Sequence, residues 1–144
     1  MRLHTATLVM TLAATAALAH SGVKNAAVKA RMDLMGEVKA ATATLGDMSK
    51  GAKPFDAAKA EAARAALERH ATRIPALFKA PESDPKTEAR PEIWTDWDGF
   101  VAIADRMETV ASAMDTGSLK TLRAGMGRLA KTCKSCHEAF RIKK

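Results

Sequence analysis

The sequence predicts an all-α protein, an antiparallel up-down four-helix bundle, on the strength of three observations. Ala, Lys, Glu, Arg, Leu and Met dominate the 144 residues, and these residue types lose little conformational freedom in a helix. No run of β-branched residues alternates with polar residues over the length of a strand. Apolar residues instead recur three and four positions apart in four stretches, and the short connections between these stretches favour antiparallel neighbours.

Residues 1–19 have the features of a secretory signal peptide and are not expected to belong to the fold. Arg2 gives a positive start, residues 7–18 are apolar but shorter than the ~20 residues that span a bilayer, and Ala17-Leu18-Ala19 has the small-x-small cleavage pattern. We therefore expect cleavage before His20, one bundle domain over residues 20–144, and a mature chain with no membrane span. An uncleaved membrane anchor is the alternative.

The first two predicted helices cover residues 23–49 and 57–78. Gly51 can end the first helix, and Asp56 is a suitable N-cap for the second. We expect a bend near Pro75, because a proline inside a helix removes one backbone hydrogen bond. The apolar face of the first helix has helical spacing: Ala27, Leu34, Val38, Ala41, Leu45 and Met48.

Two more helices are expected over residues 91–115 and 119–142, after a proline-containing loop at 80–90. Pro91 suits the first turn of the third helix, and Thr116-Gly117-Ser118 separates the third helix from the fourth. The last helix has the clearest apolar period, with members three and four residues apart: Leu119, Leu122, Met126, Leu129, Cys133, Cys136 and Phe140.

The end of the fourth helix contains Cys133-Lys134-Ser135-Cys136-His137, which has the C-x-x-C-H pattern of covalent haem attachment. Residues three and four positions apart share a helix face, so Cys133 lies beside Cys136 and His137. Two thiols can then bond one porphyrin while the imidazole binds its iron. Because both cysteines lie on the apolar face, the haem is expected between the helices, near the C-terminal helix. One covalent haem c, with its iron, is the expected cofactor.

Two cysteines at this spacing also occur in zinc sites, redox-active pairs and disulfides. A zinc site needs further ligands, and beyond residue 20 the only other histidine is His70, which has Arg69 and Arg73 nearby and suits the surface. A thioredoxin-like pair needs a strand–helix setting, and a disulfide would close only a very small loop. Export also favours haem attachment, because two cysteines in an oxidising compartment otherwise tend to form a disulfide.

The sequence resembles the class II cytochrome c family, the cytochrome c′-type bundles, over nearly all of residues 20–144. The residues that carry the resemblance are Cys133 to Arg141, Arg31-Met32-Asp33-Leu34-Met35, Lys53-Pro54-Phe55-Asp56 and Ile93-Trp94. The resemblance places Arg31 near the haem propionates and Arg141 over the proximal face, one turn after His137. The alternatives are a solvated helix charge for Arg31 and a cation favoured at a helix C-terminus for Arg141.

Trp94 and Phe140 are candidates for the surroundings of the haem. Trp94 could lie at the haem edge and Phe140 against the porphyrin. For both residues, ordinary burial in the core is an equally good interpretation.

The resemblance also points to Met35, four residues after Arg31, as the second iron ligand. Gas-binding members carry an apolar residue there, whereas low-spin electron-transfer members carry methionine. A thioether opposite histidine is a known axial pair. Met32, one turn away, is the fallback ligand, and packing is the alternative in a chain with eight methionines.

The expected function is a periplasmic electron carrier with His137/Met35 ligation, which is not an enzyme and exchanges electrons with partner proteins. The formal charge of +7 suits acidic partners, but no basic stripe with interleaved aromatic residues indicates nucleic acid. The chain is expected to be a monomer or a homodimer. The alternatives are a five-coordinate protein that binds NO or CO and a helical interaction module without haem.

Overall fold

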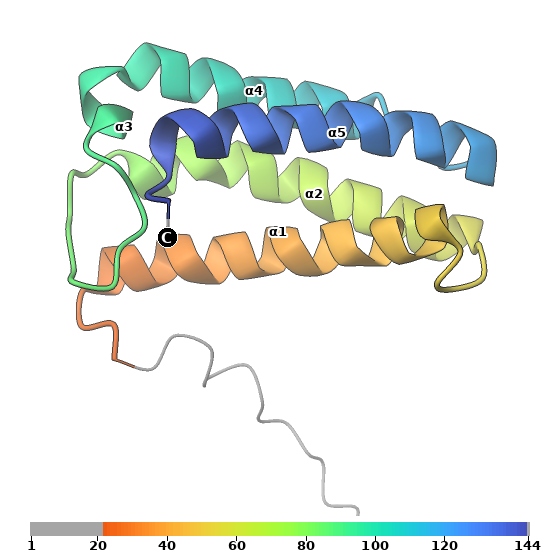
Figure 1. Cartoon of the computed structure of the whole chain (residues 1–144), viewed down its shortest axis with the longest axis horizontal. Coiled ribbons are helices and arrows are strands. Elements are labelled where there is room, and N and C mark those ends of the chain that lie inside the picture. The colour runs from red at the N-terminus through yellow and green to blue at the C-terminus, as the bar shows by residue number, and fades with distance from the viewer. Residues whose placement is uncertain (1–21, 144) are drawn as a thin grey trace, which may run out of the picture.

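The computed structural model describes residues 22–143, and all of its regular structure is helical (Figure 1). No strand occurs within that range, where the one β-like feature is an isolated bridge between Ala89 and Arg141. The predicted all-α class is therefore confirmed. The helices are α1 (Ala26–Lys50), α2 (Ala57–Phe78), α3 (Glu92–Thr95), α4 (Trp97–Ser112) and α5 (Leu119–Phe140).

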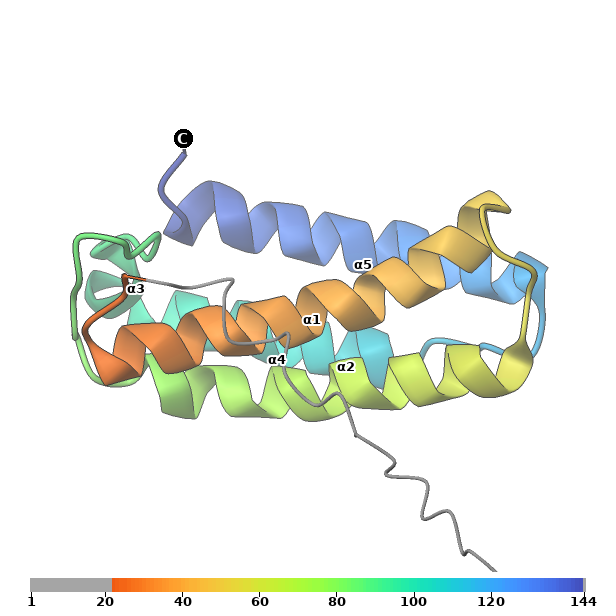
Figure 2. The same ribbon diagram turned by 90° about the horizontal axis from the view of Figure 1, so that it is seen from below.

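The four long helices form an up-down bundle in chain order. α1 packs on α2, α2 on α4 and α4 on α5, and α5 closes the ring against α1, so that α2 and α5 lie on a diagonal (Figures 1 and 2). The predicted signal peptide and its cleavage site lie outside the described residues. None of the described helices is long and apolar enough to cross a membrane.

The bundle has two different ends, called here the turn end and the cysteine end (Figure 1). The turn end holds the connections 51–56 and 113–118. The cysteine end holds the first turns of α1, the last turns of α2, the loop 79–91, α3 and the last turns of α5.

Local capping explains where the first two helices begin and end. The Asn25 side chain accepts a hydrogen bond from the Val28 N–H at 3.0 Å, so α1 begins at Ala26, three residues later than predicted. Gly51 ends α1 in the left-handed region, at φ 79°, as its sequence position indicated. The Asp56 carboxylate accepts from the Lys59 N–H at 3.0 Å, and α2 continues through Pro75 to its predicted end.

The continuous helix predicted over 91–115 is wrong. Asp96 has non-helical dihedral angles, φ −124° and ψ 56°, and separates α3 from α4. Its carboxylate accepts from the Gly99 N–H at 3.2 Å, so Asp96 is the N-cap of α4. A short side chain that can bond to the backbone favours a new helix start over a continued helix. α4 then ends at Ser112, three residues before the predicted end.

The last helix is two residues shorter than predicted, because Arg141 is extended and joins the loop before α3. The Arg90 N–H donates to the Phe140 carbonyl at 3.0 Å, and the Ile142 N–H donates to the Glu88 carbonyl at 2.8 Å. These two backbone bonds, called the C-terminal clasp below, fix the chain immediately after the predicted haem motif.

Candidate functional site

The two thiols of the motif lie on the side of α5 that faces the bundle. Cys133 and Cys136 are half-buried, pack against the core and are not bonded to each other. Burial raises the pKa of the Cys133 thiol, and burial together with the neighbouring Cys133 raises the pKa of Cys136 to about 11. Both groups are therefore protonated near neutral pH, whereas a redox-active pair needs a lowered thiol pKa.

Zinc also finds no support at the two cysteines. In residues 22–143, no group of three or more His, Cys, Asp and Glu side chains is arranged to hold a metal ion. His70 lies on α2, which is diagonal to α5, with its Nδ1 3.2 Å from the Glu37 carboxylate of α1. Within the described residues, the two cysteines therefore lack the additional ligands that a zinc site needs.

His137 follows Cys136 directly and is more exposed than either cysteine. It lines a shallow surface hollow of about 480 Å³ together with Lys134, Glu138 and Arg141. Partial burial of the imidazole, and then the Arg141 charge, lower the pKa of His137, while Glu88 opposes the shift. A lowered pKa keeps the imidazole neutral, which is the form that binds a metal.

Met35 lies at the same level of the bundle as this motif, on the neighbouring helix α1. The turn end sets the register: a Cβ on Gly46 of α1 would be 3.9 Å from Cε of Met126 in α5. The Arg123 side chain, one turn before Met126, donates to the Ser49 carbonyl at 2.7 Å. Because α1 and α5 are antiparallel, Met35, eleven residues before Gly46, is level with His137, eleven residues after Met126.

These residues fit a covalently bound porphyrin. Met35, Cys133 and Cys136 are apolar side chains that pack on the core yet remain partly exposed, and such a surface gains from an apolar cover. Met32 is also half-buried but does not belong to the set packed against the core. The donor set contains two thiols, an imidazole and a thioether, the groups that hold and ligate a c-type haem.

Arg31 is buried rather than solvated, at 2% exposure. Its Nε donates to the Leu77 carbonyl at 3.0 Å, Nη1 to the Glu82 carbonyl at 2.8 Å, and Nη2 to the Ala80 carbonyl. The guanidinium carbon also lies 5.3 Å from the ring centroids of Phe78 and Trp94. Burial lowers the pKa of Arg31, and Glu82 partly offsets the shift.

This anchoring role of Arg31 was missed by the sequence reasoning. Cations are favoured near the carbonyls at a helix C-terminus, but partners 46 to 51 residues away cannot be identified from one sequence. Arg31 ties the start of α1 to the end of α2, one helical turn before Met35. Its predicted contact with a haem propionate stays a prediction.

The other predicted neighbours of the haem have protein partners. The Trp94 indole N–H donates to the Phe78 carbonyl at 2.8 Å. Phe140 is buried and meets Phe100 edge-on, with ring centroids 5.4 Å apart. Arg141 binds the Glu88 carboxylate, with Nη2 2.6 Å from the oxygen. All three lie at the cysteine end, and their contacts with haem stay predictions.

Comparison with known proteins places the chain in a family. A family model described as Cytochrome C' matches residues 26–141. A cytochrome c-556 of Agrobacterium tumefaciens is 36% identical over 119 residues, which cover 80% of this chain and 94% of the relative.

Two solved structures extend the similarity to the fold. The cytochrome c′ of Rhodopseudomonas palustris superposes with a TM-score of 0.78 at 30% identity, covering 84% of this chain and 99% of that one. The nitric oxide complex of a leucine-to-isoleucine variant of cytochrome c′ from Alcaligenes xylosoxidans superposes with a TM-score of 0.69 at 32% identity, covering 81% and 94%. The chain therefore belongs to the cytochrome c′ family of class II cytochromes c, four-helix bundles whose cofactor is covalent haem c with its iron.

Proposed function

We propose that the protein is an electron carrier whose haem is held by Cys133 and Cys136, with His137 and Met35 as the axial iron ligands. The haem supplies a one-electron couple, and the chain binds and orients it and limits access of water. No substrate is turned over in this role, so the protein is not an enzyme. The features of residues 1–19 support export, which makes the periplasm the proposed location.

The observation that carries this proposal is the position of Met35. It is a half-buried thioether on α1, level with His137 on α5. Arg31 anchors the same helix one turn earlier, through three backbone carbonyls. A side chain on an anchored helix can keep its place through a change of iron oxidation state. Methionine opposite histidine also raises the reduction potential.

Binding of NO or CO is the second candidate function. A cytochrome c′ in the same family was solved as a nitric oxide complex, which shows that related bundles admit a gas molecule. Such binding needs an open position at the iron. The resemblance places a thioether in this chain where gas-binding members carry an apolar residue, and this difference favours electron transfer.

The replacement Met35→Leu in the haem-loaded protein tests the proposal. Leucine keeps the apolar volume but cannot ligate iron, so the spectrum is expected to change from low-spin to high-spin, and the reduced protein to bind CO rapidly. The matched control is Met32→Leu, which lies one turn away and should leave the low-spin spectrum unchanged.

Three results would contradict the assignment. An unchanged spectrum in Met35→Leu removes Met35 from the iron. A spectral change in Met32→Leu alone moves the ligand to Met32. Rapid CO binding by the unaltered ferrous protein favours the gas-binding function. Haem staining of the denatured protein separately tests the covalent bond to Cys133 and Cys136, because a thioether-linked haem stays with the chain.

A further inference from the structure

The net positive charge of the described chain is concentrated in its last helix and the residues that follow. Residues 119–143 carry seven Lys and Arg side chains and, as their one carboxylate, Glu138. The remaining described residues, 22–118, carry fourteen Lys and Arg and fifteen Asp and Glu, so they are almost neutral. α5, the helix with the haem motif, is therefore also the basic helix of the bundle.

The basic side chains form a surface on the outward side of α5, called the α5 basic face. All of its members are exposed, and those within α5 lie away from the apolar seam that packs into the bundle. Lys120, Arg128 and Lys131 form no ion pair with any other described residue. The members are Lys120, Arg123, Arg128, Lys131, Lys134, Arg141 and Lys143.

The neighbouring helix has the opposite charge. Residues 92–118, which include α3 and α4, carry six Asp and Glu side chains and, as their one cation, Arg106. α4 packs directly against α5, so positive and negative surfaces adjoin along the bundle. An acidic partner is attracted to one side and repelled from the other, which orients the protein before contact.

We propose that the α5 basic face is the docking surface for an acidic redox partner protein. The partner's identity as a redox protein rests on the proposed electron-carrier function. The charge itself is the complement of a carboxylate-rich surface. The hollow beside His137 is lined by one carboxylate, Glu138, and by three members of the face, Lys134, Arg141 and Lys143, so a partner held beside it lies against the helix that carries the cofactor.

A protein partner fits this face better than a membrane or nucleic acid. Surface helices that enter a membrane place Trp, Phe or Leu on the lipid side, whereas the exposed large hydrophobic side chain of residues 22–143 is Ile142, beyond the end of α5. Single-stranded nucleic acid needs aromatic platforms for stacking, and Phe140, the one aromatic residue of α5, is buried.

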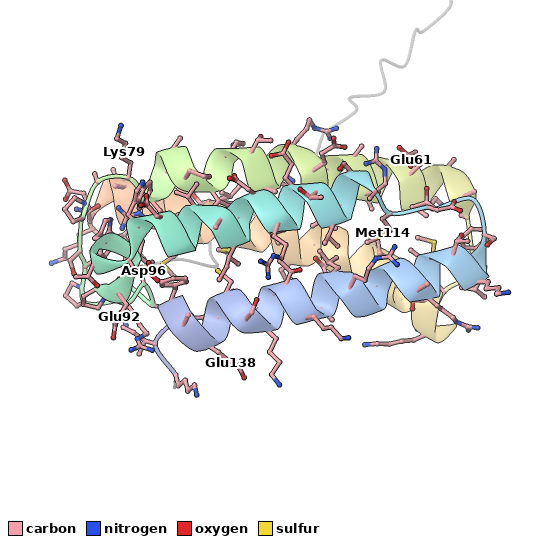
Figure 3. The ribbon with its side chains drawn as sticks, turned by 90° about the horizontal axis from the view of Figure 1, so that it is seen from above. Glu61, Lys79, Glu92, Asp96, Met114 and Glu138 are labelled. Atoms are coloured by element: carbon pink, nitrogen blue, oxygen red, sulfur yellow. The ribbon has the colours of Figure 1, made fainter. Side chains whose placement is uncertain are left out.

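The test is a pair of charge reversals, Arg128→Glu with Lys131→Glu, in the haem-loaded protein. The matched control is Arg69→Glu with Lys79→Glu, also an arginine and a lysine, on or beside the diagonally opposite helix α2. Figure 3 shows Lys79 on the side of the bundle away from Glu138 of α5. Both pairs lower the net charge equally and contain exposed side chains.

Stopped-flow oxidation of the ferrous protein by hexacyanoferrate(III), an anion, is the kinetic measurement. At low ionic strength the α5 pair is expected to slow the reaction by roughly tenfold, and the α2 pair far less. Oxidation by tris(phenanthroline)cobalt(III), a cation, should become faster in the α5 pair, and high salt should reduce both differences. Equal slowing in the two pairs, or none in the α5 pair, overturns the proposal.

Binding is measured separately, with fluorescein-labelled oligoglutamate and the ferric protein, so it needs no electron transfer. The unaltered protein and the double variant on α2 are expected to bind the peptide. The double variant on α5 is expected not to bind it. Sedimentation with phosphatidylglycerol vesicles distinguishes a membrane: vesicle binding that needs Arg128 and Lys131, without peptide binding, overturns the proposal. If neither oxidant changes the iron, the electron-carrier function fails, while the peptide result still decides on the acidic partner.

Discussion

The two ends of the bundle are held together by different interactions. At the turn end, a side chain packs tightly on a helix backbone: a Cβ on Gly125 of α5 would lie only 2.5 Å from Cγ of Met114, which follows α4 and points toward α5 (Figure 3). At the cysteine end, charged side chains bind backbone groups. Arg31 donates to three carbonyls, and Asp84 accepts from the backbone N–H groups of Lys24, Asn25 and Lys86.

The two ends of the bundle therefore have different structural roles. At the turn end, α1 and α5 meet where Gly46 faces Met126 and where the Arg123 side chain donates to the Ser49 carbonyl. Polar anchoring at the cysteine end fixes the helix ends through the loop 79–91, while Met35, Cys133 and Cys136 stay only half-buried. A cofactor can then cover these three side chains without displacing a packed core.

The largest expected effect comes from removing the arginine anchor. Arg31→Met leaves three carbonyls without their donor and should lower the free energy of unfolding of the haem-loaded protein by about 3 kcal/mol, measured by urea denaturation. Arg106→Met removes an exposed arginine of α4 and should change stability little. Equal losses in the two variants would show that the anchor contributes nothing.

An intermediate effect is expected from overfilling the turn end with Gly125→Ala. The new methyl group must displace the Met114 side chain, which should lower the free energy of unfolding by about 1–3 kcal/mol. The better helix propensity of alanine offsets only part of this loss. A Cβ on Gly127, two residues further, meets nothing within 4 Å, so Gly127→Ala should stabilise by up to ~1 kcal/mol. If both variants gain stability in urea, the close approach is not a constraint.

The smallest effect is expected from Asp84→Asn, because asparagine keeps an oxygen acceptor. Hydrogen bonds from the backbone N–H groups of Asn25, Lys86 and Lys24 lower the pKa of Asp84. This contribution to stability is therefore present above the unfolded pKa, about 3.9, and is lost as pH falls through the folded pKa. The variant should be less stable than the parent at pH 7, with the difference shrinking as pH falls below the unfolded pKa of about 3.9.

The control for this titration is Asp105→Asn, which replaces an exposed carboxylate of α4. For Asp105→Asn, the urea midpoint is expected to change with pH in the same way as the urea midpoint of the parent. A similar pH trend in both variants would attribute the effect to net charge instead of the Asp84 hydrogen bonds.

Much of the fold could be predicted, because local patterns determine it. The bounds of α2 follow from the Asp56 cap and the apolar spacing, and the seam of α5 was evident from its period. The break at Asp96 could not be separated from a continued helix, since aspartate is compatible with both. The family resemblance placed Arg31 near the haem propionates, but its carbonyl partners could not be predicted because they lie far away in sequence.

The sequence predicts those parts of the site whose residues lie close together in the chain. Cys133, Cys136 and His137 lie within five residues of one helix, and their placement on α5 follows from helix geometry. The level of Met35 depends on how α1 packs against α5, which is seen where Gly46 faces Met126 near the turn end. No pattern within α1 alone contains that information.

The C-terminal clasp holds the residues that follow α5 against the loop before α3. The amides of Arg90 and Ile142 bond across two segments that lie some fifty residues apart, so the end of α5 is tied to the loop before α3. We expect the two amide protons to exchange with deuterium at similar rates, since each hydrogen bond holds together the same two segments.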